Sequence, residues 1–234
     1  MANGKKSSSN SSVKFVFWMV GLVAVVLISF IFLGNHNKQN TSKPAGRTVT
    51  IDYQNQPYLG RSTAPVSIIE FGDYKCPNCR DFAENVIPQM KQEFVDTGKA
   101  KLYFMNDAFI NTDSIRAAKF AESVYAVLGN DTFWKFHDLL YKKQPQDSKY
   151  EKMDIYDEKF LTTTLKEVAD ATDVNKVVAN FRAKKSDAAF KKDMDLAKKL
   201  NVTGTPTIFV NGKLFEGRTM DDLKQMVNQA ARGK

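Results

Sequence analysis

The two cysteines of this 234-residue chain most constrain its fold, because they stand three positions apart where a strand is predicted to pass into a helix. Val66 to Phe71 (VSIIEF) is a short apolar run, typical of a buried strand. The motif Cys-Pro-Asn-Cys follows at 76–79, and from Cys79 to Phe94 apolar side chains recur at four-residue steps, which indicates a helix. We expect Pro88 to bend this helix, because proline removes one backbone hydrogen bond.

The remaining pattern predicts an α/β fold with a helical insertion. Lys101 to Met105 is a second predicted strand, and so short a connection favours parallel strands with a right-handed crossover. Strand character returns at 206–210, and Asn211-Gly212 signals a tight hairpin. A Thr219/Asp222 capping box then opens an amphipathic helix at the carboxyl end. The helices expected between the two strand regions lie at 115–128, 133–141, about 161–168, 174–181 and about 190–197.

Three kinds of site use two cysteines at this spacing. A structural zinc site takes four ligands, and His36 and His137 are the only histidines available, so we expect no metal. A structural disulfide closing so short a loop would add only about 2 kcal/mol in the chain-entropy model. Redox catalysis is the reading we favour, and it requires no bound cofactor.

The position of the pair supports redox chemistry. A helix amino terminus carries unpaired N–H groups and partial positive charge, which stabilises a thiolate on Cys76. Thiols in such Cys-x-x-Cys contexts have pKa values of roughly 3.5 to 7.5. Pro77 suits the first helical turn, where its missing N–H costs nothing. Cys79, one turn further, should face the core, so we expect Cys76 to be the attacking and attacked sulfur and Cys79 the resolving one.

An uncharged apolar run of 20 residues, 15–34, precedes the predicted domain and is long enough to span a bilayer. A cleaved signal peptide is the alternative, but its apolar region is shorter and ends in small residues. We therefore expect a cytoplasmic stub at 1–14, a transmembrane signal anchor at 15–34 and a polar linker at 35–49. Lysines before the run favour a single-pass protein in the cell membrane, with its catalytic domain on the extracytoplasmic side, where disulfides persist.

The net charge of +8 is concentrated near the amino terminus. Residues 1–50 hold six basic residues and no acidic ones, which leaves only +2 for the remainder. Nucleic-acid-binding domains usually show a concentrated basic footprint. We therefore expect no nucleic-acid partner.

Two blocks of sequence resemble the DsbA family of oxidoreductases, especially its membrane-anchored extracytoplasmic BdbD type. They are Glu-Phe-Gly-Asp-Tyr-Lys-Cys-Pro-Asn-Cys at 70–79 and Val-Thr-Gly-Thr-Pro-Thr at 202–207, the latter followed by Asn211-Gly212. The resemblance covers about residues 60–234. It implies a thioredoxin-like fold with an inserted all-helical subdomain. The thioredoxin-like domain would comprise 50–108 and 201–234, and the insertion 109–200.

The resemblance also implies roles for particular residues. Pro206 resembles the family's cis-proline beside the active-site cysteines, and Thr205 before it would offer backbone groups to an extended substrate. Glu70 stands six residues before Cys76, where many thioredoxin-like proteins hold a buried acid, and it is a candidate for proton transfer with Cys79. DsbA itself has histidine where this chain has Asn78, which leaves the oxidising power open.

The expected activity is that of an oxidase that introduces disulfides into unfolded exported proteins with free thiols. The family implies reoxidation by a DsbB-type, quinone-linked membrane oxidoreductase. The alternative enzymatic function is that of a reductase of extracytoplasmic proteins. The alternative non-enzymatic function is that of a membrane-tethered binding domain whose cysteine pair is only structural. No dimerisation segment is evident, so we expect a monomer. For the same reason we favour an oxidase or a reductase over an isomerase.

Overall fold

A five-stranded mixed sheet forms the centre of the computed structural model, which describes residues 49–233. Its strand order is β1-β3-β2-β4-β5; β2 and β3 are parallel, as predicted, and the other neighbouring pairs are antiparallel. The two-residue β1 was not predicted, because so short a strand shows no periodicity. The strands are β1 (Tyr58–Leu59), β2 (Val66–Gly72), β3 (Ala100–Asn106), β4 (Thr207–Val210) and β5 (Lys213–Leu214).

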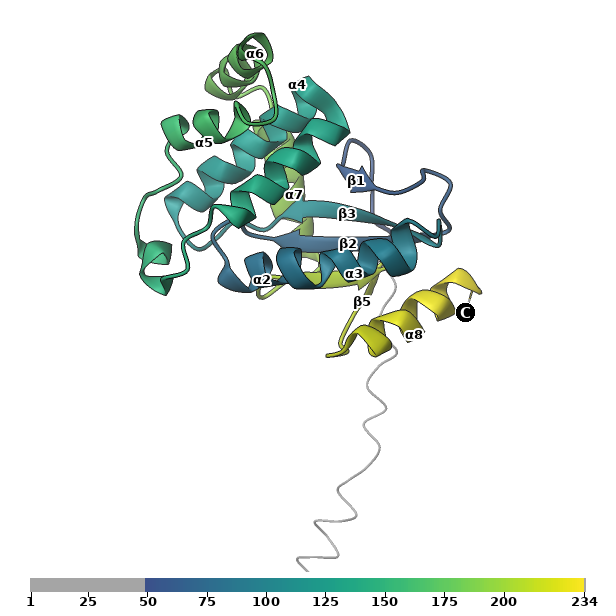
Figure 1. Ribbon diagram of the computed structural model, residues 1–234. Coiled ribbons are helices and arrows are strands. Elements are labelled where there is room, and N and C mark those ends of the chain that lie inside the picture. Colours follow the sequence, from purple (N-terminus) through teal and green to yellow (C-terminus); the bar gives the residue numbers. More distant parts are fainter. Residues whose placement is uncertain (1–48, 234) are drawn as a thin grey trace, which may run out of the picture. The chain divides into compact units, whose positions relative to one another are not determined.

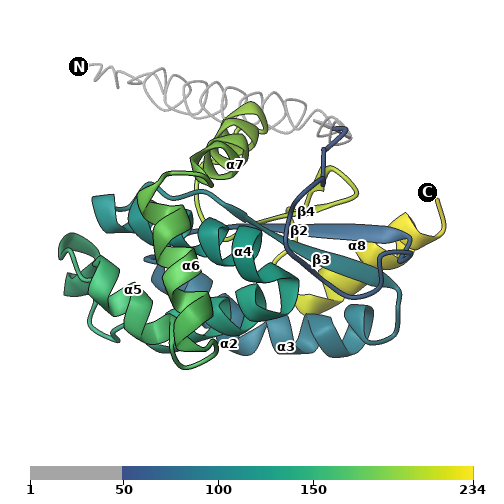
Figure 2. The ribbon, with the colours of Figure 1, turned by 90° about the horizontal axis from the view of Figure 1, so that it is seen from above.

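Helices cover the sheet and fill the interval between β3 and β4 (Figures 1 and 2). Helix α4 contains a break at Gly129 (φ 77°), where the sequence predicted the first inserted helix to end. The helices are α2 (Pro77–Asn85), α3 (Ile87–Met90), the π-helical η1 (Lys91–Val95), α4 (Thr112–Lys142), the 3-10 helix η2 (Ser148–Lys152), α5 (Glu158–Leu165), α6 (Ala171–Arg182), α7 (Asp187–Lys199) and α8 (Met220–Ala231). This is the thioredoxin-like α/β fold with the predicted helical insertion.

Alternate residues of the strands pack against different helices, because successive strand side chains point to opposite faces. Ile68 of β2 and Leu102 of β3 belong to the core cluster that α3, η1 and α8 complete. Their neighbours Ile69 and Tyr103 belong to the cluster completed by α7. Figure 2 shows α7 and α3 on opposite sides of the sheet. Glu70 stands two residues after Ile68 in β2, so its side chain points to the same face of the sheet, the one covered by α2 and α3.

The helix predicted to bend at Pro88 is interrupted just before it. Helix α2 ends at Asn85, Val86 has φ −102°, and α3 starts at Ile87 with Pro88 in its first turn. Pro88 crowds the turn before its own position and cannot donate to it, so the interruption precedes the proline. The π-helical turn beyond it was not predicted.

The carboxyl-terminal hairpin and helix follow the predicted pattern. Asn211 and Gly212 have φ values of 47° and 76° and join β4 to β5 as a two-residue turn. The side chain of Thr219 accepts from the backbone N–H of Asp222, and the carboxylate of Asp222 accepts from that of Thr219, which completes the predicted capping box. Helix α8 buries Leu223 and Val227.

The helical insertion and the cysteines share one core. Cys76 and Cys79 belong to the same buried cluster as side chains from α4, α5 and α6. Asp193 of α7 ties the insertion to β3 by accepting from the backbone N–H of Asn106 at 2.8 Å and from Nε2 of Gln56 at 2.6 Å. The insertion therefore forms part of the environment of the cysteine pair.

The predicted stub (1–14), membrane span (15–34) and nearly all of the linker (35–49) lie outside the described residues. Within residues 49–233, none of the helices has the length and apolar character that crossing a bilayer requires. The anchor therefore stays a prediction from sequence.

Candidate active site

Cys76 caps the amino terminus of α2. Its backbone is extended (φ −76°, ψ 120°), and Pro77 occupies the first helical position, as the sequence predicted. The carbonyl of Cys76 accepts the first helical hydrogen bond, from the N–H of Arg80 at 3.1 Å. Cys76 retains 6% exposure whereas Cys79, one turn inside, retains none. The first cysteine is thus the more accessible one, and both are free thiols in this structure.

Several hydrogen bonds lower the pKa of Cys76 from 9.0 to about 6. The largest contribution is a hydrogen bond from the Cys79 thiol, followed by the Thr205 side chain and the backbone N–H groups of Cys79 and Asn78. The Thr205 hydroxyl has no hydrogen-bond partner among the described residues, which leaves it free to donate to a Cys76 thiolate. In the thiol form, Cys76 Sγ donates to the Thr205 carbonyl at 3.3 Å. The helix terminus and Thr205 together favour the Cys76 thiolate.

Cys79 has the opposite character. Burial raises the pKa of its thiol well above the usual value, and its hydrogen bond to Cys76 and the nearby Glu70 carboxyl raise it further. The two sulfurs are therefore polarised, with the thiolate on Cys76 and the proton on Cys79. The predicted roles of Cys76 as the attacking sulfur and Cys79 as the resolving one require this polarity and stay a prediction.

Glu70 is buried in β2 with 1% exposure. Neither carboxylate oxygen has a hydrogen-bond partner among the described residues. Burial, together with the charge of Cys76, raises the pKa of Glu70 from 4.5 to about 8. Glu70 is thus protonated at neutral pH, and because its carboxyl affects the pKa of Cys79 it lies close to the resolving sulfur.

The Thr205–Pro206 peptide bond is cis, as the resemblance implied. It immediately precedes β4, and the hydroxyl of Thr207 donates back to the Gly204 carbonyl at 2.5 Å. The contact between Cys76 and the Thr205 carbonyl brings the second sequence block against the first, 129 residues away. All five predicted site residues belong to these two blocks: Glu70, which lies in β2, Cys76 and Cys79 to the first, and Thr205 and Pro206 to the second.

His137 is a core residue with 1% exposure. Its ring packs among aromatic side chains, and Nδ1 lies 3.0 Å from the Tyr74 hydroxyl. Burial lowers the pKa of His137 to about 3, so the imidazole is neutral. Asn78 is exposed at the surface of the motif.

The loop before Cys76 is anchored by residues that the sequence analysis missed. Asp73 Oδ1 accepts from the Lys75 N–H at 2.8 Å, and Oδ2 accepts from the backbone N–H groups of Phe109 and Ile110. Lys75 is fully buried and pairs with Asp113 of α4. A lysine beside a catalytic cysteine was the available signal, but nothing in the sequence showed that its side chain turns inward.

Thiol–disulfide exchange is the chemistry that these side chains can perform. Cys76 provides a thiolate, Cys79 a protonated thiol, and Glu70 a carboxyl group that exchanges its proton near neutral pH. Across residues 49–233, no three His, Cys, Asp or Glu side chains converge as a metal-binding group.

Known proteins are similar to this chain over both halves of the sheet and over the insertion between them. The family model "Thioredoxin" matches residues 52–229. "Probable disulfide bond formation protein D" of Bacillus anthracis is 33% identical over 225 residues, which cover 96% of this chain and 98% of the relative. "Disulfide bond formation protein D" of Bacillus subtilis (strain 168) is 34% identical over 183 residues, covering 76% and 78%. The crystal structure of oxidised BdbD from Bacillus subtilis has 31% identity and a TM-score of 0.72, covering 80% of this chain and 99% of that one.

Proposed function

The chain belongs to the DsbA-like family of thioredoxin-fold thiol–disulfide oxidoreductases, and on this premise we propose that it is an oxidase that introduces disulfide bonds into exported proteins. Membership of this family sets aside the alternative of a binding domain with a merely structural cysteine pair. The relatives named for disulfide bond formation support the oxidising direction.

The observation that carries the proposal is the position of Cys76 at the amino terminus of α2 and against Thr205, surroundings that lower the pKa of its thiol. Stabilising the thiolate stabilises the reduced enzyme and so makes its disulfide a stronger oxidant. At pH 7 a thiol with a pKa above 7 is protonated, so only the part of the Cys76 pKa shift from 7 down to about 6 stabilises the reduced enzyme. That part is about one pKa unit, which corresponds to about 30 mV in a two-electron couple. We expect a potential between the roughly −270 mV of thioredoxin and the roughly −120 mV of DsbA.

The first half of the proposed reaction begins with the Cys76–Cys79 disulfide. A substrate thiolate attacks Cys76 Sγ; the new sulfur–sulfur bond forms as the bond to Cys79 breaks, and the electron pair leaves on Cys79. Glu70, protonated at neutral pH, gives its proton to the Cys79 thiolate. Burial of Cys79 strongly favours the neutral thiol, which drives this transfer. The product is a mixed disulfide between Cys76 and the substrate.

In the second half, another substrate thiolate attacks the substrate sulfur of the mixed disulfide. The substrate disulfide forms, and Cys76 leaves as a thiolate stabilised by the helix terminus and Thr205. The substrate has lost two electrons and the enzyme has gained them. Reoxidation by a DsbB-type, quinone-linked membrane protein removes them, and Cys79 gives its proton to Glu70 in the fraction of molecules in which that carboxyl, with a pKa of about 8, is ionised.

Substrate binding is assigned to the segment before β4. Thr205 lies against Cys76, so an extended substrate that pairs with the backbone of Thr205 brings its cysteine to the reactive sulfur. The preferred substrates on this account are unfolded chains with free thiols.

The proposed location is the outer side of the cell membrane, with residues 15–34 as a single-pass anchor and the catalytic domain, a monomer, extracytoplasmic. An anchored oxidase shares the bilayer with its quinone-linked partner. Mass spectrometry of the mature protein from membranes should find this segment retained; a mature terminus near Asn35 or Asn37 would contradict the anchor.

The test of direction is equilibration with glutathione, combined with thermal melts of both redox forms. We expect the reduced protein to melt at the higher temperature and the potential to lie above that of thioredoxin. A potential near −270 mV, with the disulfide form the more stable, would favour the rival reductase.

A further inference from the structure

Three consecutive carbonyl groups before the catalytic helix turn toward the helical insertion. The Tyr74 carbonyl accepts from the Tyr156 hydroxyl at 3.0 Å and from Gln144 Nε2 at 2.9 Å. The Lys75 carbonyl accepts from the Tyr150 hydroxyl, and the Cys76 carbonyl accepts from Gln144 Nε2 at 3.1 Å. The insertion thus holds each peptide unit of the 74–76 loop with side-chain donors.

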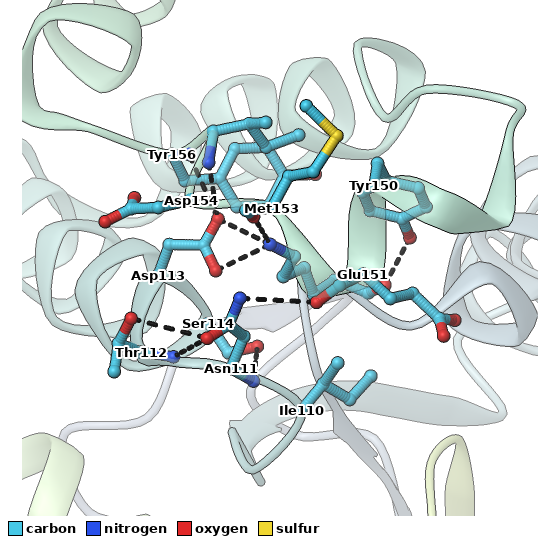
Figure 3. A network of polar contacts seen from close by, with 12 residues as sticks. Ile110, Asn111, Thr112, Asp113, Ser114, Tyr150, Glu151, Met153, Asp154 and Tyr156 are labelled. Carbon is cyan, nitrogen blue, oxygen red and sulfur yellow. Dashed lines mark hydrogen bonds and ion pairs between the residues drawn. The ribbon is translucent and has the colours of Figure 1, made fainter.

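A buried ion pair secures the same loop. Lys75 Nζ donates to both oxygens of Asp113, at 2.7 Å and 2.6 Å, and to the Met153 carbonyl. Both side chains of the pair have 0% exposure. Asp113 Oδ2 also accepts from the backbone N–H groups of Ile155 and Tyr156. Figure 3 shows Asp113 facing Met153 and Tyr156, with Tyr150 of the 3-10 helix η2 nearby.

The cost of burying this pair argues for a role beyond stability. Desolvating two charges costs several kcal/mol per ion, and apolar replacements of similar volume are often neutral or stabilising. What an ion pair with several hydrogen bonds does supply is one defined geometry. Here that geometry belongs to the residue joined directly to Cys76.

We propose that Lys75 and Asp113, with Gln144, Tyr150 and Tyr156, form a clasp that positions Cys76 for thiolate chemistry. These five are positioning residues, because they hold the backbone on which the reacting sulfur is carried. The inference deepens the proposed function and rests on its assignment of Cys76 as the attacking sulfur.

The clasp acts through the direction of the loop backbone. A carbonyl bonded to the insertion cannot turn toward the sulfur, where its negative end would oppose a thiolate. The clasp also sets the approach of Cys76 to Thr205, which lies in the segment before β4 and not on α2. Loosening it should weaken the Thr205 contribution and raise the pKa of the Cys76 thiol.

The test compares the pKa of Cys76 in reduced wild-type protein, in Tyr150→Phe and in Lys75→Met/Asp113→Asn. Thiolate absorbance near 240 nm and the pH dependence of alkylation by iodoacetamide both report it. We expect the pKa to rise by about one unit in each variant, so that alkylation at pH 6 slows about fivefold. Tyr150→Phe removes one hydroxyl, and the double variant leaves no unpaired charge, so both should fold.

Two matched variants serve as controls. Tyr125→Phe also removes one hydroxyl that donates to a backbone carbonyl, that of Gln56 at 3.2 Å. Lys119→Met/Asp187→Asn removes the half-exposed ion pair between α4 and α7. Both controls should leave the Cys76 pKa unchanged.

Clasp variants that fold and titrate like the wild type would overturn the inference. Because the clasp is judged on the difference between variant and wild type, its outcome is separate from that of the proposed function. A wild-type pKa near 9 would remove the argument for an oxidase, whereas a wild-type pKa near 6 that the clasp variants retain would remove the clasp alone.

Discussion

Two buried ionisable side chains, five residues apart, flank the reactive cysteines in contrasting states. Lys75 lies on the side of the helical insertion, with its charge matched by Asp113 and a third bond to the Met153 carbonyl. Glu70 lies in β2, and both its oxygens lack a partner among the described residues. Both side chains are essentially inaccessible to solvent.

The contrast shows two uses of burial. A charge that is paired and hydrogen-bonded stays charged and fixes a position. A carboxyl without partners becomes neutral instead, and its raised pKa brings proton exchange into the physiological range. The paired site should therefore respond to mutation through geometry and stability, and the unpaired site through proton transfer and pH.

The largest expected effect comes from removing Cys79, the sulfur to which Glu70 gives its proton. Cys79→Ala cannot form the Cys76–Cys79 disulfide that a substrate thiolate attacks, so oxidative turnover should stop. When it is mixed with a substrate disulfide, its Cys76 thiolate should form a mixed disulfide that persists, because no second enzyme thiol displaces the substrate. The substitution also removes the leading hydrogen bond to Cys76, so the pKa of Cys76 should rise. Non-reducing gels and thiol titration measure the two effects; turnover by this variant would end the resolving role of Cys79.

Breaking the paired site by Asp113→Ala should cost about 3–5 kcal/mol of unfolding free energy, because Lys75 is left charged and buried. The comparable change at an exposed pair, Asp195→Ala beside Lys191, should cost at most about 1 kcal/mol. Denaturant unfolding of both variants measures the difference. Equal losses would mean that the buried pair is not held as described.

At the unpaired site, Glu70→Gln should slow formation of the mixed disulfide and reoxidation by about 10²-fold, since proton transfer by a positioned group contributes 10²–10⁴. Stopped-flow fluorescence with a dithiol peptide measures the first step. Glu93→Gln is a suitable control, because Glu93 forms a partly exposed ion pair with Lys224. A Glu70→Gln rate equal to that of wild type would restrict Glu70 to a structural role.

The same substitution should change how stability depends on pH. The folded-state pKa of Glu70 is raised from 4.5 to about 8, so its protonated form favours the fold. That contribution is complete below pH 4.5 and is lost as the pH rises toward 8. Wild type should therefore lose on the order of 3 kcal/mol over this range relative to Glu70→Gln. Parallel pH profiles of the two proteins would contradict the raised pKa.

The smallest expected effect lies outside both sites, at exposed Asn78. In Asn78→His, a cationic imidazole beside the thiolate should raise the redox potential by a few tens of millivolts. Equilibration with glutathione measures it, and Asn78→Gln should leave the potential near wild type. An unchanged potential in the histidine variant would show that the Cys79 and Thr205 interactions dominate.

The sequence by itself determined the elements and the chemistry at the motif. Periodicity identified β2, β3, β4 and the α-helices, and the spacing of the motif indicated Cys76 and Cys79. These features depend on spacing and turn chemistry, which act over a few residues. The cis peptide before Pro206 was implied by the family resemblance and not by a local rule. The short β1 and the π-helical turn after α3 left no such local signal.

Only the tertiary structure decided the environment of the cysteines. Lys75 and Asp113 are 38 residues apart, and each is an ordinary surface residue by its sequence context. Glu70 was a candidate in the sequence, but its lack of partners follows from which side chains meet on the α2–α3 side of the sheet. Burial and pairing depend on contacts between distant segments, and the pKa of each group depends on burial and pairing. Local patterns therefore identify the reacting atoms, whereas the packing of the insertion against the sheet sets their protonation and position.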